Sequence, residues 1–130
     1  TSPVQAIDDK DKATALVIII GNLIENAFEA TVKENKDNKR VSLSIDELED
    51  KIEIIINDNG LGIEEEYIEK IFDRGYSTKS ENRGIGLALV KEKVAKLYGV
   101  IKVSSSIGEG TTFKVIIPKE ERRNVQSANS

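Results

Sequence analysis

Two asparagines four residues apart, Asn22 and Asn26, lie within an otherwise apolar stretch of the chain. Residues at this spacing share one face of a helix, and amide oxygens are among the ligands that suit a hard cation such as Mg²⁺. Further along come Asp-Asn-Gly-Leu-Gly at 58–62 and Gly-Ile-Gly-Leu at 84–87. Because glycine lets the backbone approach a phosphate group closely, these segments together predict a pocket for a nucleotide and its metal ion.

Two common phosphate-binding motifs are excluded. The chain has no Gly-x-x-x-x-Gly-Lys-Ser/Thr run, and the dinucleotide fingerprint would require a glycine at Leu89 and an apolar strand before Gly84. Residues 84–87 instead open a predicted helix, whose first amides carry partial positive charge and can meet phosphates. The alternative is that Gly84 merely starts the helix.

Apolar residues at helical spacing predict two amphipathic helices. The first spans residues 12–32 and carries both asparagines beside its buried face; the second runs from 86 to 98, with Gly99 as its stop. A short helix is expected at 64–72, where three glutamates favour the positive helix end.

Alternating apolar and polar residues predict two hairpins. The first joins strands at 41–45 and 52–56 through a polar turn, and the second joins strands at 100–105 and 112–118. With helices on one face of a mixed sheet, the predicted fold is of the α+β class, a two-layer α/β sandwich.

Composition limits the classes of function. With 130 residues, 38% of them hydrophobic, the chain suits one compact domain, which we place at 1–118, followed by a polar tail at 119–130. A net charge of −4 with interspersed signs gives no basic stripe, so nucleic acid is not expected as a partner.

The absence of cysteine excludes disulfides and thiolate metal sites and fits a reducing compartment such as the cytoplasm. No apolar run approaches the ~20 residues of a membrane helix, so no direct membrane contact is expected. The chain has no methionine, which we interpret as a sign that it is part of a longer protein.

In order and spacing, the motifs resemble those of the ATP-binding catalytic domain of sensor histidine kinases. This domain belongs to a superfamily shared with gyrase-type topoisomerases, heat-shock chaperones and mismatch-repair ATPases. The amino-acid sequence of residues 72–79 and 82–87 is most similar to that of kinases that sense citrate, fumarate or malate. The resemblance runs from about Ala13 to Pro118 and rests on five motifs: the asparagine box, which contains Asn22 and Asn26, the first glycine box at 58–62, residues 71–79, the second glycine box at 84–87, and residues 108–113.

The resemblance implies the Bergerat ATP-binding fold, with ATP between the helical layer and a lid. Residues 73–83 are charged, hydroxylated and nearly without aliphatic side chains, which predicts that this lid is mobile. Asn26 would be the Mg²⁺ ligand, and Asp58 would accept a hydrogen bond from the adenine amino group. Thr112 would support Asp58 from the pocket floor, and the backbone beside the base would come from Gly60, Gly62 and Ile63.

The same resemblance assigns roles at the phosphate end. Asn22 would lie in the nucleotide site where hydrolysing relatives have a glutamate, and an amide cannot act as a general base. Glu25 would help to orient an incoming histidine. Many relatives have a cation where this chain has Glu29, so Arg74, Lys79 and Arg83 are the candidates to meet the γ-phosphate. The phosphates would also be met by the amides of the second glycine box, which comprises Gly84, Ile85, Gly86 and Leu87.

Each assignment has a simpler alternative. The asparagines could be solvated helix residues, Asp58 an ordinary acidic turn residue, the lid cations solvated charges, and Thr112 an ordinary strand residue.

The chain has no histidine, so it cannot be its own phosphoacceptor. The resemblance implies transfer of the γ-phosphoryl group of Mg²⁺-ATP to a histidine on a separate dimerisation domain of a homodimeric, membrane-anchored sensor with a response regulator as partner. Three alternatives are an ATPase of the same fold, a serine-kinase regulator of transcription factors, and a nucleotide-binding module without transfer activity.

Overall fold

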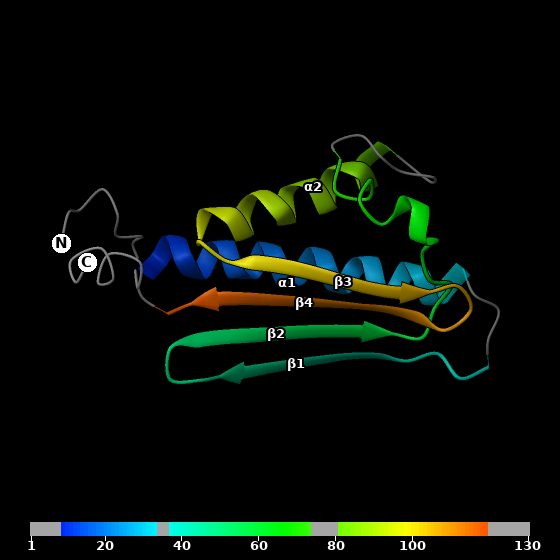
Figure 1. Ribbon diagram of the computed structural model, residues 1–130, viewed down its shortest axis with the longest axis horizontal. Coiled ribbons are helices and arrows are strands. Elements are labelled where there is room, and N and C mark those ends of the chain that lie inside the picture. The colour runs from blue at the N-terminus through cyan, green and yellow to red at the C-terminus, as the bar shows by residue number, and fades with distance from the viewer. Residues whose placement is uncertain (1–8, 34–36, 74–80, 120–130) are drawn as a thin grey trace.

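The computed structural model describes residues 9–33, 37–73 and 81–119, with the backbone alone at 33 and 81–85. Four strands lie side by side and two long helices accompany them (Figure 1). Along the chain the elements are α1 (Asp9–Lys33), β1 (Val41–Glu47), β2 (Lys51–Asp58), the 3₁₀ helix η1 (Glu65–Tyr67), α2 (Glu81–Lys96), β3 (Val100–Ser106) and β4 (Gly110–Pro118).

The strand order is β1-β2-β4-β3, and each neighbouring pair is antiparallel. The predicted hairpins and two-layer sandwich are therefore confirmed, but the prediction of a mixed sheet is wrong for the part of the chain that the structure describes. β2 and β3 do run in the same direction, as strands joined through a helix usually do. Because β4 lies between them, they never pair.

Both helices bury one face against the same side of the sheet. α1 contributes residues at four-residue spacing, α2 contributes a similar set, and alternate residues of β2 and β4 meet them in one cluster. A fully buried leucine or isoleucine contributes roughly 1.5–3 kcal/mol, so this cluster is the main source of stability. Its members are Ala15, Ile19, Leu23, Ala27, Ile54, Ile56, Ile71, Val90, Val94, Leu97, Phe113, Val115 and Ile117.

By length and composition alone, α1 could also cross a membrane, from Asp9 to Val32. The length of the longest apolar run predicts no such segment. Core helices of soluble proteins pass the same test, and here Ile19 and Leu23 are fully buried in the core.

α2 begins at Glu81, five residues before the predicted helix. Residues 81–83 contain no helix breaker, so the helix extends through them, and the second glycine box lies inside its first two turns. At the other end the left-handed residue is Tyr98, with φ 62°, rather than the expected Gly99. Glycine is required at 99 because a Cβ there would lie 2.5 Å from the carbonyl oxygen of Ile116.

The helix predicted at 64–72 is shorter than expected. Only Glu65–Tyr67 forms a 3₁₀ helix, and turns follow it. Ile71 is buried, and the ring of Phe72 lies edge-on to Phe113 with centroids 6.3 Å apart. Packing of these two side chains on the core overrides the helical tendency of the segment.

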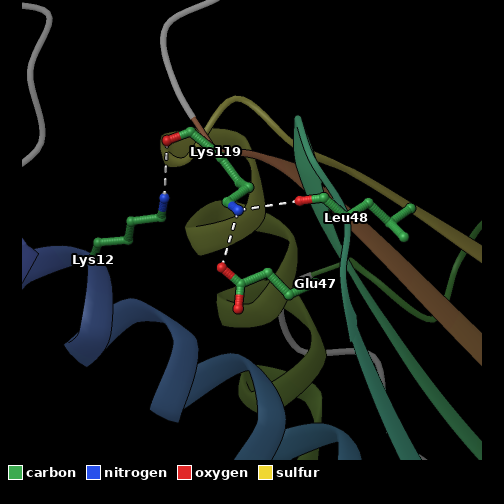
Figure 2. Close-up of polar contacts among 4 residues, drawn as sticks. All are labelled: Lys12, Glu47, Leu48 and Lys119. Carbon is green, nitrogen blue, oxygen red and sulfur yellow. Dashed lines mark hydrogen bonds and ion pairs between the residues drawn. The ribbon is translucent and has the colours of Figure 1, made fainter.

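Lys119 joins three elements at the end of β4 (Figure 2). Its ammonium group donates to the Leu48 carbonyl at 3.1 Å and lies 2.9 Å from a carboxylate oxygen of Glu47, while its own carbonyl accepts from Lys12 Nζ at 3.4 Å. The hydrogen bond and charge of Lys119 lower the pKa of Glu47. The sequence predicts that Lys119 begins the polar tail at 119–130. The rest of this tail, residues 120–130, lies outside the described residues.

Candidate functional site

Asp58 is the last residue of β2 and points toward the helical layer. The side chain is 2% exposed, and Oδ1 accepts a hydrogen bond from the Gly60 amide at 2.8 Å. A carboxylate removed from water needs hydrogen-bond donors, and the turn after the strand supplies one. The prediction had placed Asp58 in the loop; the strand extends two residues further and fixes the carboxylate on a rigid element.

Gly60 brings this turn against α1. A Cβ on Gly60 would lie 2.5 Å from the carbonyl carbon of Ala30 and 2.8 Å from the Thr31 nitrogen. The Leu61 amide donates to the Ala30 carbonyl at 3.3 Å. The turn after Asp58 therefore rests directly on the backbone of α1, at the same end as the asparagine box.

Gly62 brings the same turn against the end of β3. It has φ +87°, and a Cβ there would overlap the Ser106 carbonyl. The next amide, that of Ile63, donates to Ser105 Oγ at 2.7 Å, and the Gly108 amide donates to the Leu61 carbonyl at 2.8 Å. Gly60, Gly62 and Ile63 thus belong to one turn that follows Asp58 and packs on α1 and β3. That they shape the backbone beside a base stays a prediction.

Asn59 is a residue that the sequence analysis missed. Its Oδ1 accepts from the Arg40 amide at 2.8 Å, and its Nδ2 donates to the Asn38 carbonyl. The Asn59 amide also donates to the Arg40 carbonyl at 3.1 Å. The turn is therefore fastened to the segment before β1 as well as to α1 and β3.

The structure corrects the role expected of Thr112. Asp58 pairs with Thr111, whereas Thr112 pairs with Asn57 and accepts from its Nδ2 at 2.6 Å. Paired residues in antiparallel strands share a face, and successive residues alternate. Thr112 therefore lies on the opposite face of the sheet, and Thr111, which is buried, is the hydroxyl beside Asp58.

The asparagine box faces the second glycine box across the two helices. Asn22 Nδ2 donates to the Ile18 carbonyl at 2.8 Å, and Asn22 Oδ1 would lie 3.0 Å from a Cβ on Gly86. Asn26, one turn further along α1, is half-buried, as is Leu87, whereas Glu25 is exposed. The predicted metal ligand and phosphate segment thus belong to adjoining helices.

Several predicted residues cannot be placed. Arg74 and Lys79 lie outside the described residues, and of Arg83, Gly84 and Ile85 only the backbone is described. The described side chains include no group of three or more acids, histidines or cysteines that could hold a metal ion. A Mg²⁺ ion on Asn26 would accordingly take most of its ligands from phosphates and water, as this ion commonly does.

Residues 11–121 match the family described as histidine kinase-, DNA gyrase B-, and HSP90-like ATPases. The match covers most of the chain and all of the site described above. The chain belongs to this family.

Its relatives include sensor kinases. A probable C4-dicarboxylate sensor kinase of Halalkalibacterium halodurans is 46% identical over 106 residues, which are 81% of this chain and 20% of the relative. Sensor protein CitS of Bacillus subtilis is 44% identical over 108 residues, 83% of this chain and 20% of the relative. The chain spans about a fifth of the length of these curated relatives.

The fold is also found among solved structures. The structure of full-length ShkA in complex with AMPPNP matches with a TM-score of 0.69 and 25% identity, over 80% of this chain and 21% of that one. Together these comparisons confirm the resemblance to sensor histidine kinases, including a probable C4-dicarboxylate sensor kinase, and they confirm the fold class.

Proposed function

We propose that this domain binds Mg²⁺-ATP and transfers its γ-phosphoryl group to a histidine outside this chain, as the catalytic domain of a two-component sensor histidine kinase. The observation that carries the proposal is the buried Asp58 carboxylate, fixed by Gly60 and Gly62 beside two helices that bear the asparagine and glycine boxes. Sensor kinases among the relatives, and an ATP analogue bound to ShkA, support it.

Asp58 would recognise the base. A carboxylate only accepts hydrogen bonds, so it suits the amino group of adenine and disfavours the carbonyl oxygen that guanine carries at the same position. The cost of an unpaired buried acceptor makes such discrimination strong.

The phosphates would lie between α1 and α2. The Asn26 amide oxygen would bind Mg²⁺, and the amides of the first turn of α2, which have no acceptor within the helix, would meet the phosphates. Since Glu29 provides no positive charge, Lys79 and Arg83 remain the proposed partners of the γ-phosphate. Phosphoryl transfer needs mainly such positioning and charge stabilisation.

Asn22 supports transfer over hydrolysis. An amide cannot take a proton from water as a general base, and Asn22 Nδ2 is directed to the Ile18 carbonyl. The exposed Glu25 could instead orient the histidine of a partner. We propose that this partner is the dimerisation domain of a homodimeric, membrane-anchored sensor of citrate or a related acid, and that a response regulator receives the phosphoryl group.

Calorimetric titration tests binding. ATP is titrated into the domain with and without Mg²⁺. GTP, whose base has a carbonyl in place of the amino group of adenine, is titrated for comparison. We expect saturable ATP binding that Mg²⁺ alters and that Asp58→Asn abolishes, whereas Asp46→Asn, an exposed change in β1, leaves it intact. If Asp58→Asn bound ATP as tightly as the wild type, this result would contradict the proposed site.

A second experiment tests transfer. The domain is incubated with radiolabelled Mg²⁺-ATP and a histidine-bearing dimerisation domain from a relative, and the acid lability of the label is measured. Acid-labile label, lost when the acceptor histidine is replaced, supports a histidine kinase. Acid-stable label would indicate transfer to serine, and phosphate release without an acceptor would indicate an ATPase.

A further inference from the structure

Ser105 lies in a row of polar side chains that includes Asp58. In the sheet register Asp58 of β2 pairs with Thr111 of β4, and Thr111 pairs with Ser105 of β3. Directly paired residues point to the same face, with Cβ atoms roughly 4.5–5.5 Å apart. The three side chains therefore cross three neighbouring strands on the face that packs against the helices.

The Ser105 hydroxyl makes three contacts. It accepts from the Ile63 amide at 2.7 Å, donates to the Gly110 carbonyl at 2.9 Å, and lies 2.7 Å from Thr111 Oγ1. A serine hydroxyl has one hydrogen to donate and two lone pairs to accept with. These three contacts therefore use its complete hydrogen-bonding capacity.

The direction of the third bond follows from the other two. The Gly110 carbonyl can only accept, so it takes the one hydrogen of Ser105. Thr111 must then be the donor in its 2.7 Å contact with Ser105. With its hydrogen directed at Ser105, the Thr111 hydroxyl has only lone pairs left to offer toward Asp58 and the site.

We propose that Ser105 is a positioning residue that holds Thr111 Oγ1 as a second hydrogen-bond acceptor, beside the Asp58 carboxylate, at the base end of the site. Two neighbouring acceptors, the Asp58 carboxylate and Thr111 Oγ1, match a group that brings two hydrogens, such as the exocyclic amine of adenine or a water molecule that such an amine orients. Neither of these two groups can donate to a carbonyl at the same position. The proposal rests on the proposed function, because it concerns which purine nucleotide that site selects.

The test compares ATP with inosine triphosphate, in which a carbonyl replaces the amine, by calorimetric titration in the presence of Mg²⁺. In the wild type we expect tighter binding of ATP. In Ser105→Ala the Thr111 hydroxyl is free to turn and donate, so the ratio of the two dissociation constants should fall by about fivefold, the effect of roughly one hydrogen bond. Ser105→Thr keeps the hydroxyl and should restore the ratio.

The matched control is Ser104→Ala. Ser104 is exposed and pairs with Thr112 on the opposite face, so the ratio should not change. If Ser105 contributed to stability alone, Ser105→Ala would weaken the binding of ATP and of inosine triphosphate by the same factor. The ratio of their dissociation constants would then be unchanged, which would overturn the proposal while leaving ATP binding established. A wild type that binds neither nucleotide would overturn the proposed function and this inference with it.

A second pair of variants serves if Ser105→Ala does not fold. Thr111→Ser keeps the hydroxyl and should keep the preference for ATP. Thr111→Val removes it and should lower the preference by a similar factor of about five. Equal preference in both variants would overturn the proposal.

Discussion

Replacing Gly60 by alanine should separate the turn after Asp58 from α1. The added Cβ would lie 2.5 Å from the Ala30 carbonyl carbon, 2.6 Å from its oxygen and 2.8 Å from the Thr31 nitrogen. All three atoms belong to helix backbone, which cannot rotate away as a flexible side chain could. Ordinary contact begins near 3.4 Å, so the turn must move by nearly 1 Å.

Overpacking of this kind typically costs about 1–3 kcal/mol in the free energy of unfolding. The movement also lengthens the hydrogen bond from the Leu61 amide to the Ala30 carbonyl, which is now 3.3 Å. It shifts the Gly60 amide as well, which donates a hydrogen bond to the Asp58 carboxylate. We therefore expect Gly60→Ala to lower stability by about 2 kcal/mol and ATP affinity by at least about tenfold.

The matched control is another glycine-to-alanine change on α1. A Cβ on Gly21 would have nothing within 4 Å, and alanine in a helix interior is more favourable than glycine by about 0.5–1 kcal/mol. Gly21→Ala should therefore stabilise the domain and leave ATP affinity unchanged. Urea unfolding measures the first quantity and calorimetric titration the second. If the free energy of unfolding of Gly60→Ala were within about 0.5 kcal/mol of the wild-type value and its ATP affinity were unchanged, the reasoning about this contact would be refuted.

Three further predictions concern other contacts. Asn59→Ala removes the side-chain bonds to Asn38 and Arg40 and should lower the free energy of unfolding by about 1–2 kcal/mol; an unchanged urea midpoint would contradict this. Gly86→Ala should weaken ATP binding several-fold with little loss of stability, because its Cβ meets a single side-chain atom at 3.0 Å; equal affinity in a titration would count against it. The hydrogen bond and charge of Lys119 lower the pKa of Glu47, so the stability that this contact contributes is present at neutral pH and is lost as the pH falls through that lowered value. Glu47→Gln should abolish this part of the acid dependence in urea unfolding, and an identical dependence in both proteins would disprove the assignment.

The elements that the sequence predicted well are those with a strong local signal. The spacing of Ile19, Leu23 and Ala27 defines α1, and alternation in β2 and β4 defines the face that meets it. The asparagine and glycine boxes were recognisable because each is a short run whose residue types suit a nucleotide. In the structure Gly60 lies against the Ala30 backbone and Gly86 lies beside Asn22.

Several errors involve contacts between distant parts of the chain. The register that places Thr111, not Thr112, beside Asp58 is set by pairing with a strand more than fifty positions away, and one position of error moves a side chain to the other face. Ser105 meets an amide 42 residues away and Lys119 a carbonyl 71 residues away. The sequence next to Ser105 or Lys119 does not indicate which distant residue each of them contacts.

The bond between Lys12 and Lys119 has a mechanical consequence. The first turn of α1 and the end of β4 meet at one end of the sheet, whereas β2 delivers Asp58 at the opposite end (Figure 1). α1, with 25 residues, is a rod of about 37 Å between them. Because one helix spans this whole distance, a change at the Lys119 end acts on the site through the position of α1 and not by direct contact.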